Sequence, residues 1–233
     1  MTDRAGFTRC AVTLDEMFAK LGKREGTMRL ALKLLEQRGG SRIIETGCAR
    51  EPDNWSGDGM STLVFAQWIR EHGGSLRTID NDVDHLAACK LMVGYPIQYT
   101  LAHSVAALRR NRRRIDLLYL DSLDYLFGAL CDLYGGKTDL DVAIATLRAM
   151  PEAEIVAQHH EIIDPSQQHC RAEVSAAMPM LPLGALVLID DAGLPGGGKA
   201  RLAKKLLWDA GWECLADEYQ TLWSKPYVAE AAA

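Results

Sequence analysis

Carboxylates follow several short apolar segments of this 233-residue chain, at the point where each segment ends. They are Glu45, Asp80, Asp121, Asp190 and Asp191. If the segments are parallel strands of one sheet, their carboxyl ends share the edge at which open α/β sheets bind ligands. Carboxylates gathered at one edge repel one another, so we expect a cationic group or many hydrogen-bond donors among them.

The loop after the first of these segments suits a ligand that approaches the backbone. Gly47 directly follows the strand, where a tight turn needs backbone freedom. The loop continues through Gly57 and Gly59 to Ser61 and Thr62 at the start of a helix, whose free N–H groups are donors. Cys48-Ala49-Arg50 stands where the dinucleotide motif G-x-G-x-x-G has its later glycines, which argues against a pyrophosphate cradle.

Asp80 lies about 35 residues after Glu45, at the end of the second predicted strand. A carboxylate at this position can accept hydrogen bonds from both hydroxyls of a ribose. The alternative is a turn or cap residue ahead of the helix that begins near Asp82. The glycine loop at a suitable distance favours the ribose role.

Apolar segments alternate with amphipathic ones along the chain. Strands are expected over 42–45, 76–80, 97–101, 115–120 and 185–189, with a final antiparallel pair over 212–216 and 221–224. Helices are expected over 13–38 with a break near 22–26, and over 61–72, 82–91, 104–110 and 200–210. This order predicts an α/β fold, a parallel sheet with helices on both faces.

Composition bounds the class of protein. With 48% apolar residues, 24% charged residues and a net charge of −5, the chain is expected to be one globular domain with extra segments. We expect a helical extension over 1–40, a main domain over 41–228 with an insertion at about 123–182, and a disordered tail over 229–233. The six scattered cysteines suit reduced thiols, and we expect a cytoplasmic protein without a signal peptide or membrane span.

The order of these motifs resembles that of the class I S-adenosylmethionine-dependent methyltransferases. IIETGCAREPDNWSGDGMST resembles the first motif of the branch that includes macrocin O-methyltransferase-like and other small-molecule O-methyltransferases, and LYLDSLDY and PLGALVLIDDAG resemble its later motifs. The resemblance covers roughly Arg42 to Ser224. It implies a Rossmann-like, doubly wound, mostly parallel seven-stranded sheet with an antiparallel last strand.

The resemblance also implies site residues for S-adenosylmethionine. Those at the methionine part and the adjoining helix start are Glu45, Gly47, Cys48, Ala49 and Ser61. Asp80 would hold the ribose, Asn81 would flank the adenosine, and His103 and Ser104 would lie beside the adenine. Asp121 would stand between cofactor and substrate as a catalytic residue.

A divalent cation is a further expectation. Asp121, Asp190 and Asp191 end neighbouring strands, and three carboxylates converging on one point suit Mg²⁺. The metal-dependent enzymes resembled here use such a trio, in which the metal lowers the pKa of a substrate hydroxyl. The alternative is that Asp190 or Asp191 only caps the following loop.

Histidines in the insertion are candidates for a general base. His159 and His160 are adjacent and point in different directions, so only one can serve, and His160 is our choice. His169 follows on a helix expected to begin near Pro165 and could face the site. The alternative for each is a surface or structural histidine.

The sequence thus predicts an O-methyltransferase acting on a small-molecule hydroxyl, of a sugar or natural-product intermediate, with divalent-metal assistance. Its expected partner is that small molecule, and nucleic acid and membrane are not expected. The resemblance also suggests a homo-oligomer.

The basic run Arg109–Arg114 leaves an RNA or protein methyltransferase as an alternative, although a solvated helix end explains it as well. Asp121-Ser122-Leu123-Asp124 does not match the Asp/Asn-Pro-Pro-aromatic motif of base N-methylation. A non-catalytic cofactor-binding module is the remaining alternative.

Overall fold

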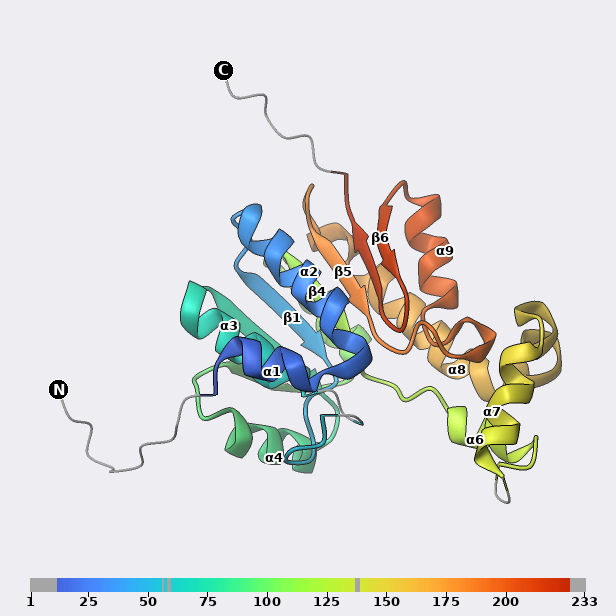
Figure 1. The fold of residues 1–233 in the computed structure, drawn as a ribbon. Helices are drawn as coiled ribbons and strands as arrows, with labels where there is room; N and C mark the ends of the chain where they lie inside the picture. The colour runs from blue at the N-terminus through green and yellow to red at the C-terminus, as the bar shows by residue number, and fades with distance from the viewer. Residues whose placement is uncertain (1–11, 56, 58–59, 137–138, 227–233) are drawn as a thin grey trace.

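The fold is built on one seven-stranded sheet, seen in a computed structural model that describes residues 12–55, 57, 60–136 and 139–226. Its strands are β1 (Arg42–Thr46), β2 (Ser75–Asp80), β3 (Gln98–Leu101), β4 (Leu117–Leu120), β5 (Leu186–Ile189), β6 (Glu213–Asp217) and β7 (Thr221–Ser224). The strand order is β3-β2-β1-β4-β5-β7-β6, and β7 runs antiparallel to both of its neighbours. The predicted fold class is confirmed (Figure 1).

Helices cover both faces of the sheet, as expected for a doubly wound fold. On one face pack α1 (Leu14–Lys20), α2 (Glu25–Gln37) and α3 (Ser61–His72), and on the other α5 (Ser104–Arg110), α8 (Glu152–Ala177) and α9 (Arg201–Asp209). The helix α4 (Val83–Val93) adjoins α3 and β3. Ile43 and Leu117 belong to the core between the sheet and α1–α3. Their neighbours Ile44 and Leu118 belong to the core between the sheet and α5, α8 and α9. Burial on both sides explains why these strands read as continuous apolar runs.

The N-terminal helices are part of this first layer. The capping box is present: the Glu16 amide donates to Thr13 Oγ1 at 3.2 Å, and the Thr13 amide donates to Glu16 Oε2 at 2.7 Å. The break between the helices is a short 3₁₀ turn, Gly22–Arg24, so it is narrower than expected and Gly26 lies inside α2. This turn places Arg24 beneath the strand ends, where the side chain is buried.

The expected insertion has two parts. The helices α6 (Phe127–Asp132) and α7 (Leu140–Ala149) and the start of α8 form a small core of their own, beside the sheet in Figure 1. The later half of α8 packs on the sheet through Cys170, Val174 and Ala177. The range 123–182 therefore includes the crossover helix itself. Helix α8 runs through Pro165 and leaves helical geometry at His159, so no separate helix begins near Pro165.

The remaining short elements are the 3₁₀ turns Met178–Met180 and Pro195–Gly197. The cysteines among the described residues are all free, in agreement with the expected thiols. No helix in the described ranges is both long and apolar enough to cross a bilayer. Cys10, Gly59 and the tail over 229–233 lie outside the described residues.

Candidate functional site

The turn after β1 brings the end of that strand against the end of β4. Gly47 has φ of +79°, and its amide donates to the Ile79 carbonyl at 2.9 Å. A Cβ atom at this position would lie 2.3 Å from the Asp121 carbonyl oxygen. Only glycine satisfies both the backbone angle and the close approach. The turn therefore leaves an open edge above β1 and β4 where a ligand can reach the backbone.

Glu45 supports this turn from inside the protein. Its fully buried carboxylate accepts hydrogen bonds from Ser61 Oγ at 2.6 Å and Thr62 Oγ1 at 2.7 Å. Thr62 Oγ1 in turn accepts one from the Ala49 amide at 3.0 Å. These bonds fasten the loop after β1 to the first turn of α3. Glu45, Ala49 and Ser61, expected at the cofactor, thus lie behind the cleft wall and position its lining.

Burial raises the pKa of Glu45 to about 7, although the two hydroxyl donors oppose the shift. The unfolded chain ionises near the ordinary value of 4.5, so the folded state holds the proton longer. Stability conferred by protonated Glu45 is present at low pH and is lost as the pH rises from 4.5 to 7. Above that window the folded protein bears the full cost of a buried charge.

We expect Glu45→Gln to remove this pH dependence. Between pH 5 and pH 8, the free energy of unfolding of the wild type should fall by about 2–3 kcal/mol relative to the variant, from the size of the pKa shift. Urea unfolding at both pH values measures the difference. The exposed Glu213→Gln is the matched control and should track the wild type. Parallel pH curves for Glu45→Gln and the wild type would show that Glu45 does not titrate as described.

Asp80 ends β2 with its carboxylate at the cleft. Oδ2 accepts from the Cys48 amide at 3.3 Å, and Oδ1 accepts from the Asp82 amide at 2.9 Å. His85 Nδ1 lies 3.5 Å from Oδ1. Asp82, not Asp80, caps α4, since its side chain accepts from the amides of Asp84 and His85. Asp80 is therefore not the cap of α4, but its hydrogen bond from the Asp82 amide, two residues further on, is that of a turn residue. Its carboxylate also lines the cleft, where the ribose role stays a prediction.

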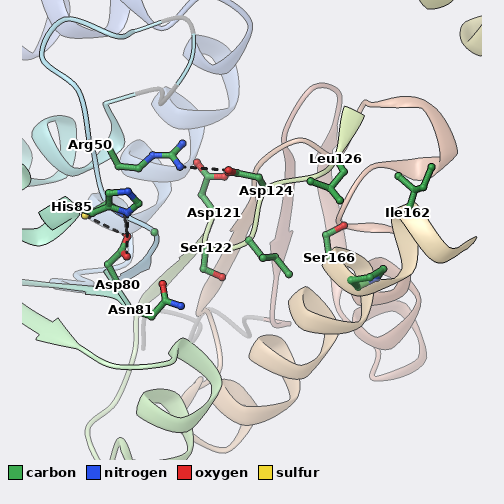
Figure 2. Close-up of a pocket in the computed structure, with 14 residues that line it drawn as sticks. Arg50, Asp80, Asn81, His85, Asp121, Ser122, Asp124, Leu126, Ile162 and Ser166 are labelled. Carbon is green, nitrogen blue, oxygen red and sulfur yellow. Dashed lines mark hydrogen bonds and ion pairs between the residues drawn. The ribbon is translucent and has the colours of Figure 1, made fainter. Parts of the chain in front are cut away.

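The cleft above the strand ends has two lobes that share Gly47, Asp80, Asn81, Ser122 and Leu123. The larger lobe, about 310 Å³, is closed on its far side by the insertion. Figure 2 shows Asp80, Asn81 and His85 on one side, Leu126, Ile162 and Ser166 on the other, and Asp121 and Ser122 between them. The smaller lobe adds Ala102, His103, Ser104 and His169. Residues expected at the ribose and the adenine thus line adjoining lobes, and of those expected at the methionine part, Gly47 and Cys48 line the larger lobe.

A buried polar network forms the wall of the smaller lobe. His169 Nε2 lies 3.0 Å from Ser104 Oγ and 2.9 Å from Ser122 Oγ. Ser122 Oγ donates to Glu173 Oε1 at 2.7 Å, and His169 Nε2 is 3.3 Å from the same oxygen. Burial raises the pKa of Glu173, but hydrogen bonds from His169 and the serines lower it further than burial raises it. An ionised Glu173 therefore holds both serines in place.

Asp190 is paired with an arginine from the N-terminal turn. Arg24 Nε lies 2.8 Å from Asp190 Oδ2 and 3.1 Å from Oδ1, with the side chains 7% and 0% exposed. Burial lowers the pKa of the guanidinium, but the Asp190 charge raises it further, so Arg24 stays cationic. The ring of Tyr219 also lies 5.0 Å from the guanidinium carbon. Asp190 is consequently a partner of Arg24 beneath the cleft.

Lys199 holds the other two carboxylates of the expected metal trio. Its Nζ is hydrogen-bonded to Asp121 Oδ1 and lies 3.4 Å from Asp191 Oδ2. Asp191 Oδ1 also accepts from Tyr219 Oη at 2.6 Å. Burial lowers the pKa of Lys199, but the surrounding carboxylates raise it well above its ordinary value. An ammonium group therefore stands among these acids.

The residues present do not fit the predicted magnesium site. A cation such as Mg²⁺ needs carboxylate oxygens that converge without a competing positive charge. Asp190 faces Arg24, while Asp121 and Asp191 face Lys199. Within the described ranges, no group of three or more His, Cys, Asp or Glu side chains is arranged to hold a metal ion. The two protein cations supply the positive charge that the acidic strand ends require.

His160 is not among the residues that line either lobe. The same helix instead contributes Ile162, Pro165 and Ser166 to the larger lobe and His169 to the smaller one. The assignment of His160 as a base stays a prediction. His159 is turned the other way and bonds to Tyr134 Oη at 2.7 Å.

Sequence reasoning missed several residues of the site. Arg50, His85 and Asp124 line the larger lobe, and Arg50 Nη1 lies 3.4 Å from Asp124 Oδ2 (Figure 2). Arg24 and Lys199 sit below it. The repulsion among the strand-end acids predicts that a cationic partner exists. Nothing in the sequence spacing identifies Arg24 and Lys199 as that partner.

Comparison with solved structures gives the class of fold. An O-methyltransferase from Bacillus cereus in complex with SAH superposes with a TM-score of 0.52 at 12% identity, covering 91% of this chain and 90% of that one. CalS11, a calicheamicin methyltransferase, gives 0.53 at 12% identity, covering 91% and 80%. The N-methyltransferase NodS from Bradyrhizobium japonicum WM9 gives 0.51 at 14% identity, covering 88% and 97%.

These likenesses show that the chain has the Rossmann-like fold of class I methyltransferases, as the resemblance implied. No protein-family model and no curated protein matches the sequence. The function therefore has to be argued from the site.

Proposed function

We propose that the protein is an S-adenosylmethionine-dependent methyltransferase acting on a hydroxyl of a small molecule, such as a sugar or natural-product intermediate. The observation that carries the proposal is the carboxylate of Asp80 at the end of β2, held by the Cys48 amide and facing the cleft beside the Gly47 turn. An acid at this place suits the paired hydroxyls of a ribose. The methyltransferase fold supports the same cofactor.

Different residues along the cleft would contact the different parts of the cofactor. Gly47 and Cys48 would contact its methionine part through the backbone, and Asp80 would accept hydrogen bonds from the ribose. Asn81 would lie against the adenosine, with His103 and Ser104 at the adenine in the smaller lobe. When bound, the cofactor supplies a methyl group on a sulfonium centre. The carboxylates at this edge favour that positive charge.

The larger lobe is proposed to hold the acceptor. Its wall is apolar at Leu126 and Ile162 of the insertion, and polar at Asp124 of the insertion and Arg50 of the loop after β1. This suits a compact molecule with both kinds of surface. Lys199 bonds to Oδ1 of Asp121, and Oδ2 has no hydrogen-bond partner among the described residues. We assign Asp121 Oδ2 the hydrogen bond from the acceptor hydroxyl, and this carboxylate would take the hydroxyl proton as the oxygen–methyl bond forms and the sulfur–methyl bond breaks. Positioning of that oxygen in line with the methyl group would supply much of the rate.

Methyl transfer to a panel of acceptors tests the proposal. The protein with S-adenosylmethionine is offered small glycosides and phenols, amines of matched size, and an RNA oligonucleotide, and products are read by mass spectrometry. A methyl group on oxygen is expected. Asp121→Asn should lower the rate about 100-fold while binding SAH as the wild type does. Methylation of the amine or the RNA, or full activity of Asp121→Asn, would contradict this acceptor assignment.

Metal assistance is not retained in this proposal, since Lys199 occupies the place between Asp121 and Asp191. We expect Mg²⁺ or EDTA to leave the unfolding temperature of the wild type unchanged. In Lys199→Ala the freed carboxylates should repel each other, and Mg²⁺ should raise the unfolding temperature. Thermal scans of both proteins with and without the ion measure this. Stabilisation of the wild type by Mg²⁺ would restore the metal site.

A further inference from the structure

A second groove lies at the opposite edge of the sheet, where the parallel strands begin. It has a volume of about 620 Å³ and is formed by the starts of β1 and β2, the segment before β3, and the segment between α5 and β4. Its charged lining consists of Arg42, Arg77, Arg110, Arg112, Arg113 and Arg114. No Asp or Glu is part of that lining. The groove therefore concentrates positive charge in a chain whose net charge is −5.

Most of this charge is not neutralised by the protein. Arg114 pairs with Asp116. The other five arginines make no ion pair with any residue in the described ranges; Arg77 Nε, for example, donates to Thr100 Oγ1 at 3.0 Å. Burial, and after it the nearby charge of Arg113, lower the pKa of Arg77. Guanidinium groups that line one groove repel one another unless an anion lies between them.

The fold gathers these arginines from separate segments. Arg42 is paired in register with Ser75 at the start of β2, and Arg77 with Gln98 at the start of β3. With strands about 4.8 Å apart, the side chains of neighbouring strands surround a compact space. The exposed arginines at 110, 112, 113 and 114 border it from the far side of β1. A solvated helix end would explain Arg110, but not its place in one lining with Arg42 and Arg77.

The lining also has an apolar part, formed by Tyr95, Pro96 and Ile97. A cavity of this size with both apolar and charged walls is typical of small-ligand sites. The acidic remainder of the chain would repel a long polyanion that extends beyond the groove. These features favour a compact anion over a nucleic-acid strand.

We propose that this groove binds a small ligand with two or more linked phosphate groups, of the nucleoside diphosphate or triphosphate class. Guanidinium forks bind phosphate oxygens in pairs, which suits the convergent arginines. The ring of Tyr95 and the face of Pro96 supply a surface for the planar base. The site lies at the edge away from the cleft, and it is independent of the proposed methyl transfer.

Calorimetric titration of the full chain at physiological salt tests the proposal, with inorganic triphosphate and GTP as probes. One molecule of each should bind per chain, GTP more tightly, and guanosine should not bind. The double variant Arg110→Gln/Arg113→Gln should bind both triphosphate and GTP at least about tenfold more weakly. The control Arg109→Gln/Arg148→Gln, which removes the same charge from exposed positions outside the groove, should change affinity less than about twofold.

Three results would overturn the proposal. They are absence of binding at millimolar triphosphate, an equal loss of affinity in both double variants, and tighter binding of a single-stranded RNA 12-mer than of GTP. The last would assign the groove to nucleic acid. Unfolding temperatures of the two double variants establish that each remains folded.

Discussion

Arg24→Met is expected to lower the free energy of unfolding by about 3–5 kcal/mol, because it leaves the charge of Asp190 buried without a partner. Asp190 is 0% exposed and receives two contacts from Arg24 Nε. Methionine keeps the unbranched apolar stem of the side chain, so the loss reports the charge more than the packing. Urea unfolding at pH 7 measures the change.

The control for this prediction is Arg29→Met on the neighbouring surface of α2. Arg29 pairs with Asp15 and Glu25 where its side chain is 39% exposed, and its loss should cost less than about 1 kcal/mol. In Arg24→Met/Asp190→Asn the unpaired charge is gone, and more than half of the stability should return. If Arg24→Met were as stable as Arg29→Met, Arg24 would not be the partner that Asp190 requires.

Gly47→Ala is expected to cost about 4 kcal/mol and to abolish SAH binding. An L-residue at φ of +79° is strained, which costs about 1–2 kcal/mol. The added Cβ would also lie 2.3 Å from the Asp121 carbonyl oxygen, so the ends of β1 and β4 must separate at a further cost of about 1–3 kcal/mol. That displacement moves the backbone proposed to contact the cofactor. Unfolding and SAH titration of the purified variant measure both effects.

Gly39→Ala is the control that has the backbone strain of an L-residue at positive φ without the displacement of a neighbouring strand. Gly39 has φ of +63°, and a Cβ there meets nothing within 4 Å. This variant should lose only about 1–2 kcal/mol and bind SAH like the wild type. Normal SAH binding by Gly47→Ala would show that the turn after β1 is not part of the cofactor site.

The sheet and its edge could be predicted because they depend on local patterns. The buried runs at 42–46 and 117–120 have no competing helical period, and each acid follows its strand directly. Parallel pairing then brings Asp80 and Asp121 to one edge without any knowledge of side-chain contacts. The need for positive charge among these acids follows from electrostatic repulsion alone.

The residues that supply this positive charge could not be predicted from the sequence. Arg24 is one of several charged residues in a glycine-flanked turn, and Lys199 follows three glycines that read only as a loop. Both reach the acids through tertiary packing, over 166 residues of chain in the case of Arg24. The sequence pattern alone therefore predicts a metal bound by three of the acids. Helix α8 likewise packs against two separate cores along its length, which no periodicity reveals.

Titration of the protein with SAH tests the central claim, that the strand-end cleft is an S-adenosylmethionine site. We predict one SAH bound per wild-type chain, with affinity at least about tenfold weaker in Asp80→Ala, because the ribose loses its acceptor. Asp84→Ala, an exposed acid in the first turn of α4, should bind as the wild type does. No binding by the wild type, or equal binding by Asp80→Ala, would contradict the account.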